Sequence, residues 1–460
     1  MRPADRPLHR YPASETQSYR LDRATQFSPT PKPDILPGDQ DARAAYARYL
    51  AMDAAIYGLP CVLQHREMVR QAVDATQPRY VGFNRFVHDR DLAGPGYPAF
   101  KSPNSDTLYS NAWLDLTQAP VLITTPDVGL LYYTLQLLDM HANASNIGTR
   151  TYGNKAGRYL VASAAWDGEV PTGAVLFRVA TPTAWVLMRV FAQNADEISL
   201  ARSIQNRVTI TPLGPPSDVS TCPLIDDLQA PAFFKALDHV IRTNGVPEQE
   251  DALVYRFRAI GLGAPKPFDH AGLDPDVRAG LEAGFADAMQ IIASSRSQLG
   301  IPTGTGWNKV EKARYGFNYL SRAVTNFVGL GANVEEENYS FNTFTDGQGV
   351  PLDGSTSRYA LEITPPPVDA FWSLTLYDGS NFELFPNVIG RYLISDRQPA
   401  GQSAPDGRRT IVMQHKRPDD VSNWLPAPAG PFYLAFRAYL PKPEMLAGAW
   451  QPNAIVRLAG

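Results

Sequence analysis

Hydrophobic and polar positions divide the chain into two regions of short alternating runs with a region of longer period between them. Alternation with a period of two is typical of strands that bury one face, and Gly and Pro separate the runs. The first region predicts strands at 107–116, 121–124, 130–139, 158–165, 175–179 and 185–191. The second predicts strands at 358–363, 370–378, 391–395, 409–414, 432–440 and 454–458.

Between these regions the apolar residues recur every three or four positions, which is typical of amphipathic helices. The predicted helices span 230–243, 248–260, 274–299 and 309–330, and the last stops at Gly329 and Gly331. A further helical pattern covers 41–74, where Gly58 and Pro60 predict a kink between two short helices. We therefore expect a helical insert between two β regions.

The two β regions also resemble one another in sequence. Each has an apolar strand that ends in Asp (Asp139 and Asp378), then a Gly-Arg-Tyr-Leu strand, then an apolar strand with a central Arg (Arg189 and Arg437). The same features in the same order favour an internal duplication, although amphipathic strands can also look alike by chance.

These patterns predict an α+β chain that is mainly β, with two jelly-roll-like antiparallel β-sandwich modules and a helical insert. The expected parts are a mobile N-terminal arm at 1–40, the N-terminal helices and first sandwich at 41–194, the insert at 195–335, and the second sandwich at 336–460. A chain of 460 residues exceeds the size of one hydrophobic core, which agrees with several domains.

Composition excludes several classes of function. The formal net charge is −4 and no Lys or Arg stripe is present, so nucleic acid is not an expected partner. The two cysteines lie far apart, and the seven histidines form no sequence-local ligand motif, so neither a disulfide framework nor a structural zinc site is predicted. No segment has the apolar length of a membrane span or a secretory signal, so we expect a soluble cytoplasmic protein. A homo-oligomer is compatible with the sequence.

The strand at 130–139 ends in the strongest polar constellation. Alternate residues of an extended chain share a face, so Asp139, His141 and Asn143 would follow an apolar inner face at the mouth of a sandwich. Asp139 and His141 are then a candidate general acid/base pair, with Asn143 binding substrate. The same three residues could bind a divalent cation, and a third reading is a polar turn in which Asp139 caps backbone amides.

A second cluster lies in 102–116. Tyr109, Asn111 and Trp113 share one strand face, which would suit a polyhydroxylated ring, and Tyr109 is also a candidate catalytic residue. Asn104 and Asp106 precede the strand; Asp106 is a candidate catalytic residue and Asn104 a candidate substrate ligand, although a Pro-Asn-Ser-Asp run is also typical of a turn.

The central arginines need polar partners inside apolar strands, because an unpaired buried charge is costly. We expect Arg189 to pair with Asp139 and Arg437 with Asp378, and Arg189 is also a candidate substrate anchor. Trp372 and Tyr377 are further candidate substrate contacts, although a core position is the simpler expectation for Trp372.

Several long runs resemble a bacterial family that joins two domains of unknown function, 1254 at the N-terminus and 1214 at the C-terminus. They are KSPNSDTLYSNAWLDL, TPDVGLLYYTLQLLDMHANASNIGTRTYG, YLSRAVTNFVGLGANVEEENY and VDAFWSLTLYDGSNF. The resemblance extends from about residue 41 to the end and implies two β-sandwich modules with helices around them, but no reaction. The residues that match its strongest motifs are Asn104, Asp106, Thr107, Tyr109, Trp113, Asp139, Trp372, Ser373 and Tyr377. Members often look exported, and this chain departs from them in lacking a signal.

Three functions stay open from the sequence. One is a cofactor-independent hydrolase or lyase that acts on a small polyhydroxylated or carboxylated substrate. Another is a protein that binds a carbohydrate or metabolite without turnover, and the last is a divalent-metal-dependent enzyme at Asp139, His141 and Asn143.

Overall fold

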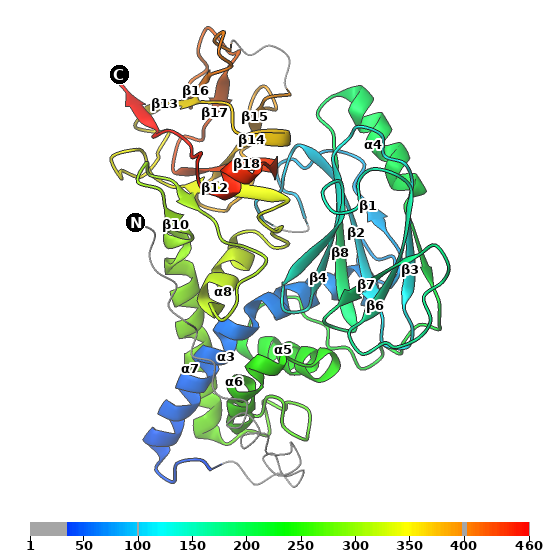
Figure 1. The fold of residues 1–460 in the computed structure, drawn as a ribbon. Helices are drawn as coiled ribbons and strands as arrows, with labels where there is room; N and C mark the ends of the chain where they lie inside the picture. Colours follow the sequence, from blue (N-terminus) through cyan, green and yellow to red (C-terminus); the bar gives the residue numbers. More distant parts are fainter. Residues whose placement is uncertain (1–34, 99–100, 398–402, 460) are drawn as a thin grey trace, which may run out of the picture.

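The computed structural model of the chain describes residues 35–98, 101–397 and 403–459. Figure 1 shows one β module at the right, a second at the upper left, and a group of helices below them. The expected mainly β architecture with helices between two β modules is therefore confirmed. Most of the predicted N-terminal arm lies outside the described residues.

The first module consists of two sheets. Five strands form the larger sheet in the order β1-β2-β8-β4-β5, and four form the smaller sheet in the order β7-β6-β3-β9. The bounds are β1 Val87–His88, β2 Thr107–Asp115, β3 Val121–Thr125, β4 Tyr133–Asp139, β5 Ala144–Gly148, β6 Gly157–Ser163, β7 Val175–Val179, β8 Thr183–Phe191 and β9 Thr209–Pro212.

The second module repeats this plan. Its larger sheet has the order β10-β11-β12-β18-β14-β15, and its smaller sheet has the order β17-β16-β13-β19. The bounds are β10 Ile301–Pro302, β11 Asn308–Lys309, β12 Asn338–Thr343, β13 Arg358–Ile363, β14 Val368–Asp378, β15 Leu393–Ser395, β16 Arg409–Gln414, β17 Trp424–Pro426, β18 Phe432–Pro441 and β19 Val456–Leu458.

The modules correspond strand by strand, as a duplication predicts. The run β2-β8-β4-β5 matches β12-β18-β14-β15, and the run β7-β6-β3-β9 matches β17-β16-β13-β19. In each small sheet one pair is parallel, β6 with β7 and β16 with β17, which departs from the fully antiparallel sandwich that we expected. The correspondence corrects one detail, because the Gly-Arg-Tyr-Leu strand β6 matches β16 rather than β15.

Each module has a core between its two sheets, and the larger sheets are buried on their second face as well. The strand β3 alternates between buried and partly exposed positions, which is typical of a strand with one buried face. By contrast, nearly every residue of β2, β4 and β8 is buried. The second face of each large sheet is therefore covered by parts of the chain outside its own sandwich.

A group of packed helices lies against part of these second faces. Its members are α3 Gln40–Met68, α5 Ala230–Asn244, α6 Asp251–Arg256, α7 Pro275–Ser294 and α8 Tyr319–Val328. Residues of α3 and α5 share a hydrophobic core with Trp113 and Trp185 of the first large sheet and with Tyr433 of the second. The helices thus join the two modules from below.

The N-terminal helix differs from the prediction, because α3 is one continuous helix that contains Pro60 and runs into a short π-helical turn, Val69–Val73. Gly58 does not break it. A Cβ atom at Gly58 would lie 2.4 Å from Leu237 Cδ2, and one at Gly284 of α7 would lie 2.2 Å from the carbonyl oxygen of Arg48. These glycines allow the helices to pack closely.

The structure also differs from the predicted helix at 309–330, since α8 begins only at Tyr319. Residues 308–309 instead form β11, which pairs with β12, and Ala313 has a positive φ of 63°. The predicted insert further contains α4 (Ala195–Arg207) and β9, which the structure places in the first module because β9 pairs with β3.

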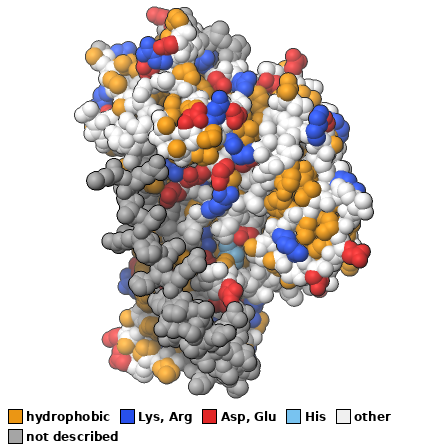
Figure 2. Space-filling model, in the orientation of Figure 1, with side chains coloured by type: hydrophobic (Ala, Val, Ile, Leu, Met, Phe, Trp, Pro, Cys, Tyr) orange, Lys and Arg blue, Asp and Glu red, His pale blue; other side chains and the backbone are white. Residues whose placement is uncertain are grey.

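Within the described ranges, no helix is both long enough and apolar enough to cross a bilayer. On the face shown in Figure 2, acidic and basic side chains gather along the seam between the two modules.

Candidate functional site

The second faces of the two large sheets carry matching polar residues. In the first sheet Arg189 of β8 lies opposite Thr134 on β4 and Tyr109 on β2. In the second sheet Arg437 of β18 lies opposite Ser373 on β14 and Ser340 on β12. The two arginines thus occupy equivalent positions of the duplication, on faces that point away from the cores of their own sandwiches.

A cavity of about 100 Å³ lies where these faces meet the loop before α8 and the segment that follows α8. Both arginines line it, together with Lys312, Tyr109, Asn104 and further residues of β12 and β18. Next to it, aromatic side chains of both modules pack directly, since the ring centroids of Phe191 in the first module and Phe371 in the second lie 4.4 Å apart. The site is therefore formed between the modules and not at the mouth of either sandwich.

Carbonyl and hydroxyl oxygens hold the two guanidinium groups in place. Arg189 donates to the Gln136 side chain and, at 2.8 Å, to the Gly331 carbonyl oxygen, and it lies over the Tyr109 ring at 5.5 Å. Arg437 donates to Tyr377 Oη at 2.9 Å and to the Ser102 carbonyl oxygen at 3.1 Å. These neutral partners orient the arginines, and neither guanidinium group forms an ion pair with a described carboxylate.

Lys312 places an amino group beside the two guanidinium groups. It is buried, and its Nζ donates to Asn338 Oδ1 at 2.6 Å and to Ser340 Oγ at 2.5 Å. Burial, together with the charges of Arg437 and Arg189, holds the pKa of Lys312 well below its usual range. The amine is therefore more easily deprotonated than an exposed lysine and can act as a base or a nucleophile.

The charges and the hydrogen-bonding groups of the cavity both favour an anion. Among the described residues, no carboxylate lines the cavity, and none lies within 4 Å of the charged groups of Arg189, Lys312 or Arg437. Two lining amides, Asn333 Nδ2 and Asn338 Nδ2, are buried donors without a hydrogen-bond partner in the described part of the chain. The same charges disfavour a divalent cation here.

Asp106 lies just behind the cavity wall and organises it. Its carboxylate accepts hydrogen bonds from Ser373 Oγ at 2.7 Å and from Tyr439 Oη at 3.1 Å, and Tyr439 Oη in turn accepts one from Asn104 Nδ2 at 2.6 Å. Burial raises the pKa of Asp106, while the hydrogen bond from Ser373 and the charge of Arg437 oppose that shift. Asp106 thereby links the first module to β14 and β18 of the second.

Five of the candidate residues from the sequence meet at this cavity. Tyr109, Asn104 and Arg189 line it, Asp106 supports its wall, and Tyr377 contacts Arg437. Their roles as catalytic or substrate-binding residues stay predictions.

The other aromatic candidates are packed away from the cavity. Trp113 stacks on Trp185 with ring centroids 5.4 Å apart, and Asn111 Oδ1 accepts a hydrogen bond from Trp185 Nε1 at 3.1 Å. Trp372 lies in the core of the second module, where it stacks on Phe436. Tyr109, Asn111 and Trp113 do share one strand face, but only its Tyr109 end reaches the cavity.

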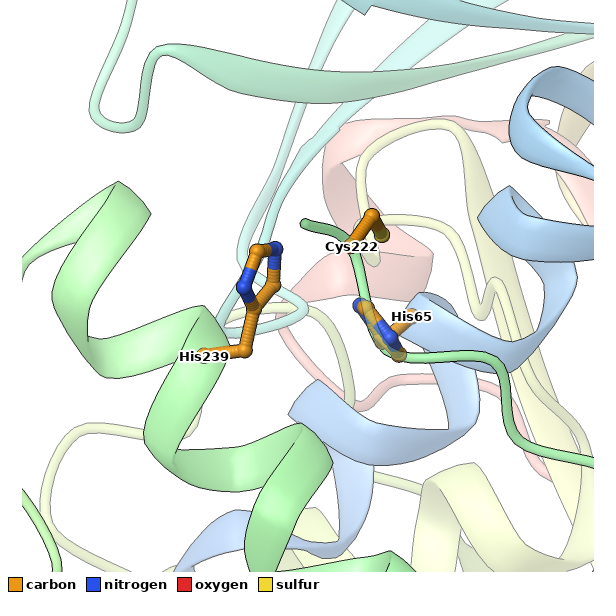
Figure 3. A group of neighbouring side chains, drawn as sticks. All are labelled: His65, Cys222 and His239. Carbon is orange, nitrogen blue, oxygen red and sulfur yellow. The ribbon is translucent and has the colours of Figure 1, made fainter. Parts of the chain in front are cut away.

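A separate group of three side chains with metal-binding atoms lies among the helices. Figure 3 shows His65 of α3, His239 of α5, and Cys222 from the loop between β9 and α5. No sequence motif predicts this group, because its members lie far apart in the chain.

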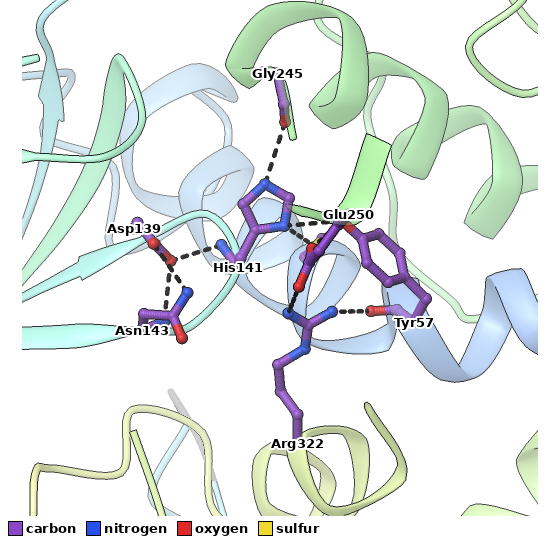
Figure 4. Close-up of polar contacts among 8 residues, drawn as sticks. Tyr57, Asp139, His141, Asn143, Gly245, Glu250 and Arg322 are labelled. Carbon is purple, nitrogen blue, oxygen red and sulfur yellow. Dashed lines mark hydrogen bonds and ion pairs between the residues drawn. The ribbon is translucent and has the colours of Figure 1, made fainter. Parts of the chain in front are cut away.

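Asp139, His141 and Asn143 form a turn with its own set of contacts, shown in Figure 4. Asp139 Oδ1 accepts hydrogen bonds from the backbone amides of His141 and Asn143, each at 2.9 Å, and Asp139 Oδ2 accepts one from Asn143 Nδ2 at 3.1 Å. These are the contacts of the capped turn that was one of the three alternatives for this segment.

The imidazole of His141 points away from Asp139. Its Nε2 lies 3.1 Å from the Gly245 carbonyl oxygen, and its Nδ1 lies 3.5 Å from Tyr57 Oη and 3.6 Å from Cys61 Sγ. Although burial opposes it, contact with Cys61 raises the pKa of His141 to about 9, with a smaller contribution from Asp139. The structure therefore does not bring Asp139, His141 and Tyr109 to one opening.

The predicted ion pairs of the two arginines are wrong. Arg189 lies opposite Thr134, whereas Asp139 lies opposite Ala184, five residues along the strand, which places the carboxylate about 16 Å away. In the second module Asp378 accepts instead from the backbone amide of Ser380 at 2.8 Å. Carbonyl and hydroxyl oxygens take the role that we assigned to the acids.

Lys312, Asn333 and Asn338 were not predicted from the sequence as parts of the site. Lys312 fell inside a predicted helix, and β12 was not predicted at all. A weak signal was available, because the duplication requires a second-module counterpart of β2, and β12 takes that position.

The comparisons with known proteins agree with the fold and assign no activity. Two family models match, "Protein of unknown function (DUF1254)" at residues 83–212 and "Protein of unknown function (DUF1214)" at residues 337–443. No curated protein matches the chain.

The solved structures that match the chain include the following two. The VPA0106 protein from Vibrio parahaemolyticus has a TM-score of 0.66 and 23% identity over 90% of this chain and 100% of its own, which indicates a shared fold. An uncharacterised protein from Burkholderia cenocepacia has a TM-score of 0.42 and 12% identity over 92% of this chain and 91% of its own. With both domain models matched in the expected order, the chain belongs to the family of proteins that join these two domains of unknown function.

Proposed function

We propose that the chain binds a small organic anion carrying a carboxylate in the cavity between its two modules. The observation that supports this proposal is the meeting of Arg189, Lys312 and Arg437 at a cavity that no described carboxylate lines. Buried guanidinium groups without an ion-pair partner gain most from an anionic ligand. The arginines also offer the planar donors that suit a carboxylate.

The size of the cavity and the two neutral amides among its lining residues narrow the class of ligand. A cavity of about 100 Å³ suits a compound of a few carbon atoms rather than a polymer or a nucleotide. The free amide donors of Asn333 and Asn338 could bind hydroxyl or carbonyl oxygens of the same molecule. A small carboxylated and polyhydroxylated metabolite meets both requirements.

Binding is tested with succinate and its neutral diamide as probes, by calorimetry and thermal shift. We expect the anion to bind and the diamide not to, and we expect Arg437→Gln to weaken anion binding at least tenfold, or about 1.4 kcal/mol. Arg158→Gln, at an exposed arginine of β6, is the matched control and should retain full affinity. Equal binding of anion and diamide, or unchanged affinity in Arg437→Gln, would contradict the proposal.

A second candidate function, turnover of the bound anion without a cofactor, is favoured by Lys312. A buried amine with a lowered pKa beside two guanidinium groups can accept a proton next to a carboxylate, as a lyase or a hydrolase requires. In this version Lys312 takes the proton-transfer role that the sequence analysis assigned to Asp139 and His141. Lys312→Met should then abolish turnover in a substrate screen, whereas Lys155→Met, at an exposed lysine, should not.

A further inference from the structure

A group of potential ligands lies outside the inter-module cavity, where the end of α3 meets α5. One ligand atom from each of His65, Cys222 and His239 lies within 4.8 Å of the others. The imidazole rings of His65 and His239 are 5.4 Å apart and inclined by 60° (Figure 3). Side-chain movements of about 1 Å would bring the three atoms to the separations of a tetrahedral site.

The hydrogen bonds of His65 orient its ring for such a role. His65 is fully buried, and its Nε2 contacts the Pro223 carbonyl oxygen at 2.9 Å. If Nε2 donates there, Nδ1 keeps its lone pair, and Nδ1 is buried without a hydrogen-bond partner among the described residues. In metal-binding histidines, the ring nitrogen that does not bind the metal usually donates a hydrogen bond to a group such as a carbonyl oxygen.

Burial disfavours the charged form of both imidazoles. Burial lowers the pKa of His65 to about 4 and also lowers the pKa of His239. Burial raises the pKa of the Cys222 thiol to about 11, so that without a bound cation the sulfur stays protonated. Two neutral imidazoles and one thiol that a metal can deprotonate are typical ligands of a borderline-soft cation.

We propose that His65, Cys222 and His239 form a zinc site with one open coordination position. A pocket of about 120 Å³ borders all three residues and leaves room for a water molecule as the fourth ligand. The carboxylates of Asp115 and Asp218 also border this pocket, but each accepts hydrogen bonds from nearby serine residues. The zinc site is therefore assigned to the His₂Cys set alone.

The test uses the full chain, freed of metal with a chelator and titrated with Zn²⁺ against a chromophoric competitor. We expect one equivalent of Zn²⁺ to bind, and we expect Cys222→Ser and His239→Gln each to weaken binding by at least about 100-fold. Cys61→Ala and His270→Gln serve as controls, because they remove a thiol and an imidazole outside the proposed site. Both variants should bind Zn²⁺ with the affinity of the unchanged chain. Co²⁺ should give a thiolate charge-transfer band that is absent in Cys222→Ser.

Two results would overturn the proposal. One is the absence of stoichiometric Zn²⁺ binding to the unchanged chain. The other is stoichiometric binding that persists in both Cys222→Ser and His239→Gln. Circular dichroism checks that each variant is folded, and Cys222 lies in a partly exposed loop, where a serine leaves the helices intact. The outcome is independent of anion binding in the inter-module cavity.

Discussion

Replacing Glu337 by Gln is expected to change how the stability of the chain depends on pH. Glu337 is 1% exposed and stands next to β12. Its Oε2 accepts a hydrogen bond from Tyr132 Oη at 3.2 Å, and its Oε1 has no hydrogen-bond partner in the described part of the chain. Burial raises the pKa of Glu337 from 4.5 to about 7.

The direction of the effect follows from this shift. Because the pKa in the folded chain is the higher one, the folded state favours the protonated carboxyl. The stabilising contribution is complete below pH 4.5 and is lost as the pH rises through 7. Each pKa unit corresponds to 1.36 kcal/mol, so the loss between pH 4 and pH 8 is about 3 kcal/mol. Glutamine carries no proton that titrates here, so the variant should not show this loss.

Denaturant unfolding followed by circular dichroism at pH 4, 6 and 8 measures the effect. The free energy of unfolding of Glu337→Gln, minus that of the unchanged chain, should rise by up to about 3 kcal/mol over this range. Glu444→Gln, at an exposed residue of α9 (Pro443–Leu446), serves as the matched control and should show no such trend. A difference for Glu337→Gln that is the same at all three pH values would refute the reasoning.

Three further perturbations test the helix packing, the cavity and the second core. Gly284→Ala places a Cβ atom 2.2 Å from the Arg48 carbonyl oxygen, so α3 and α7 must separate, and thermal unfolding should show a loss of about 1–3 kcal/mol. Anion binding beside Lys312 should raise the lowered pKa of Lys312 and take up a proton, so calorimetry in two buffers of different ionisation enthalpy should report proton uptake, and affinity should fall as the pH rises. Trp372→Ala should cost about 3–5 kcal/mol of stability but leave anion affinity unchanged, whereas a ligand-binding role for Trp372 requires the affinity to fall.

Strand patterns predicted the β modules well because alternation reports directly on a buried face. The predicted strands at 175–179, 358–363 and 409–414 coincide with β7, β13 and β16. The periodicity of a segment was less informative where tertiary contacts favour a different secondary structure. The segment around Lys312 has a helical period, but pairing of β11 with β12 and the contacts of Lys312 with Asn338 and Ser340 keep it out of α8.

The candidate site shows the same division between local and tertiary information. The sequence by itself determined that Arg189 and Arg437 occupy equivalent strands, because a repeated order of residues can be recognised by comparing two segments of the sequence. Only the tertiary structure decided that both line one cavity with Lys312, and that His65, Cys222 and His239 lie together. Those groupings depend on how sheets and helices pack across long stretches of chain, and the periodicity of a single segment carries no information about what packs against its buried face.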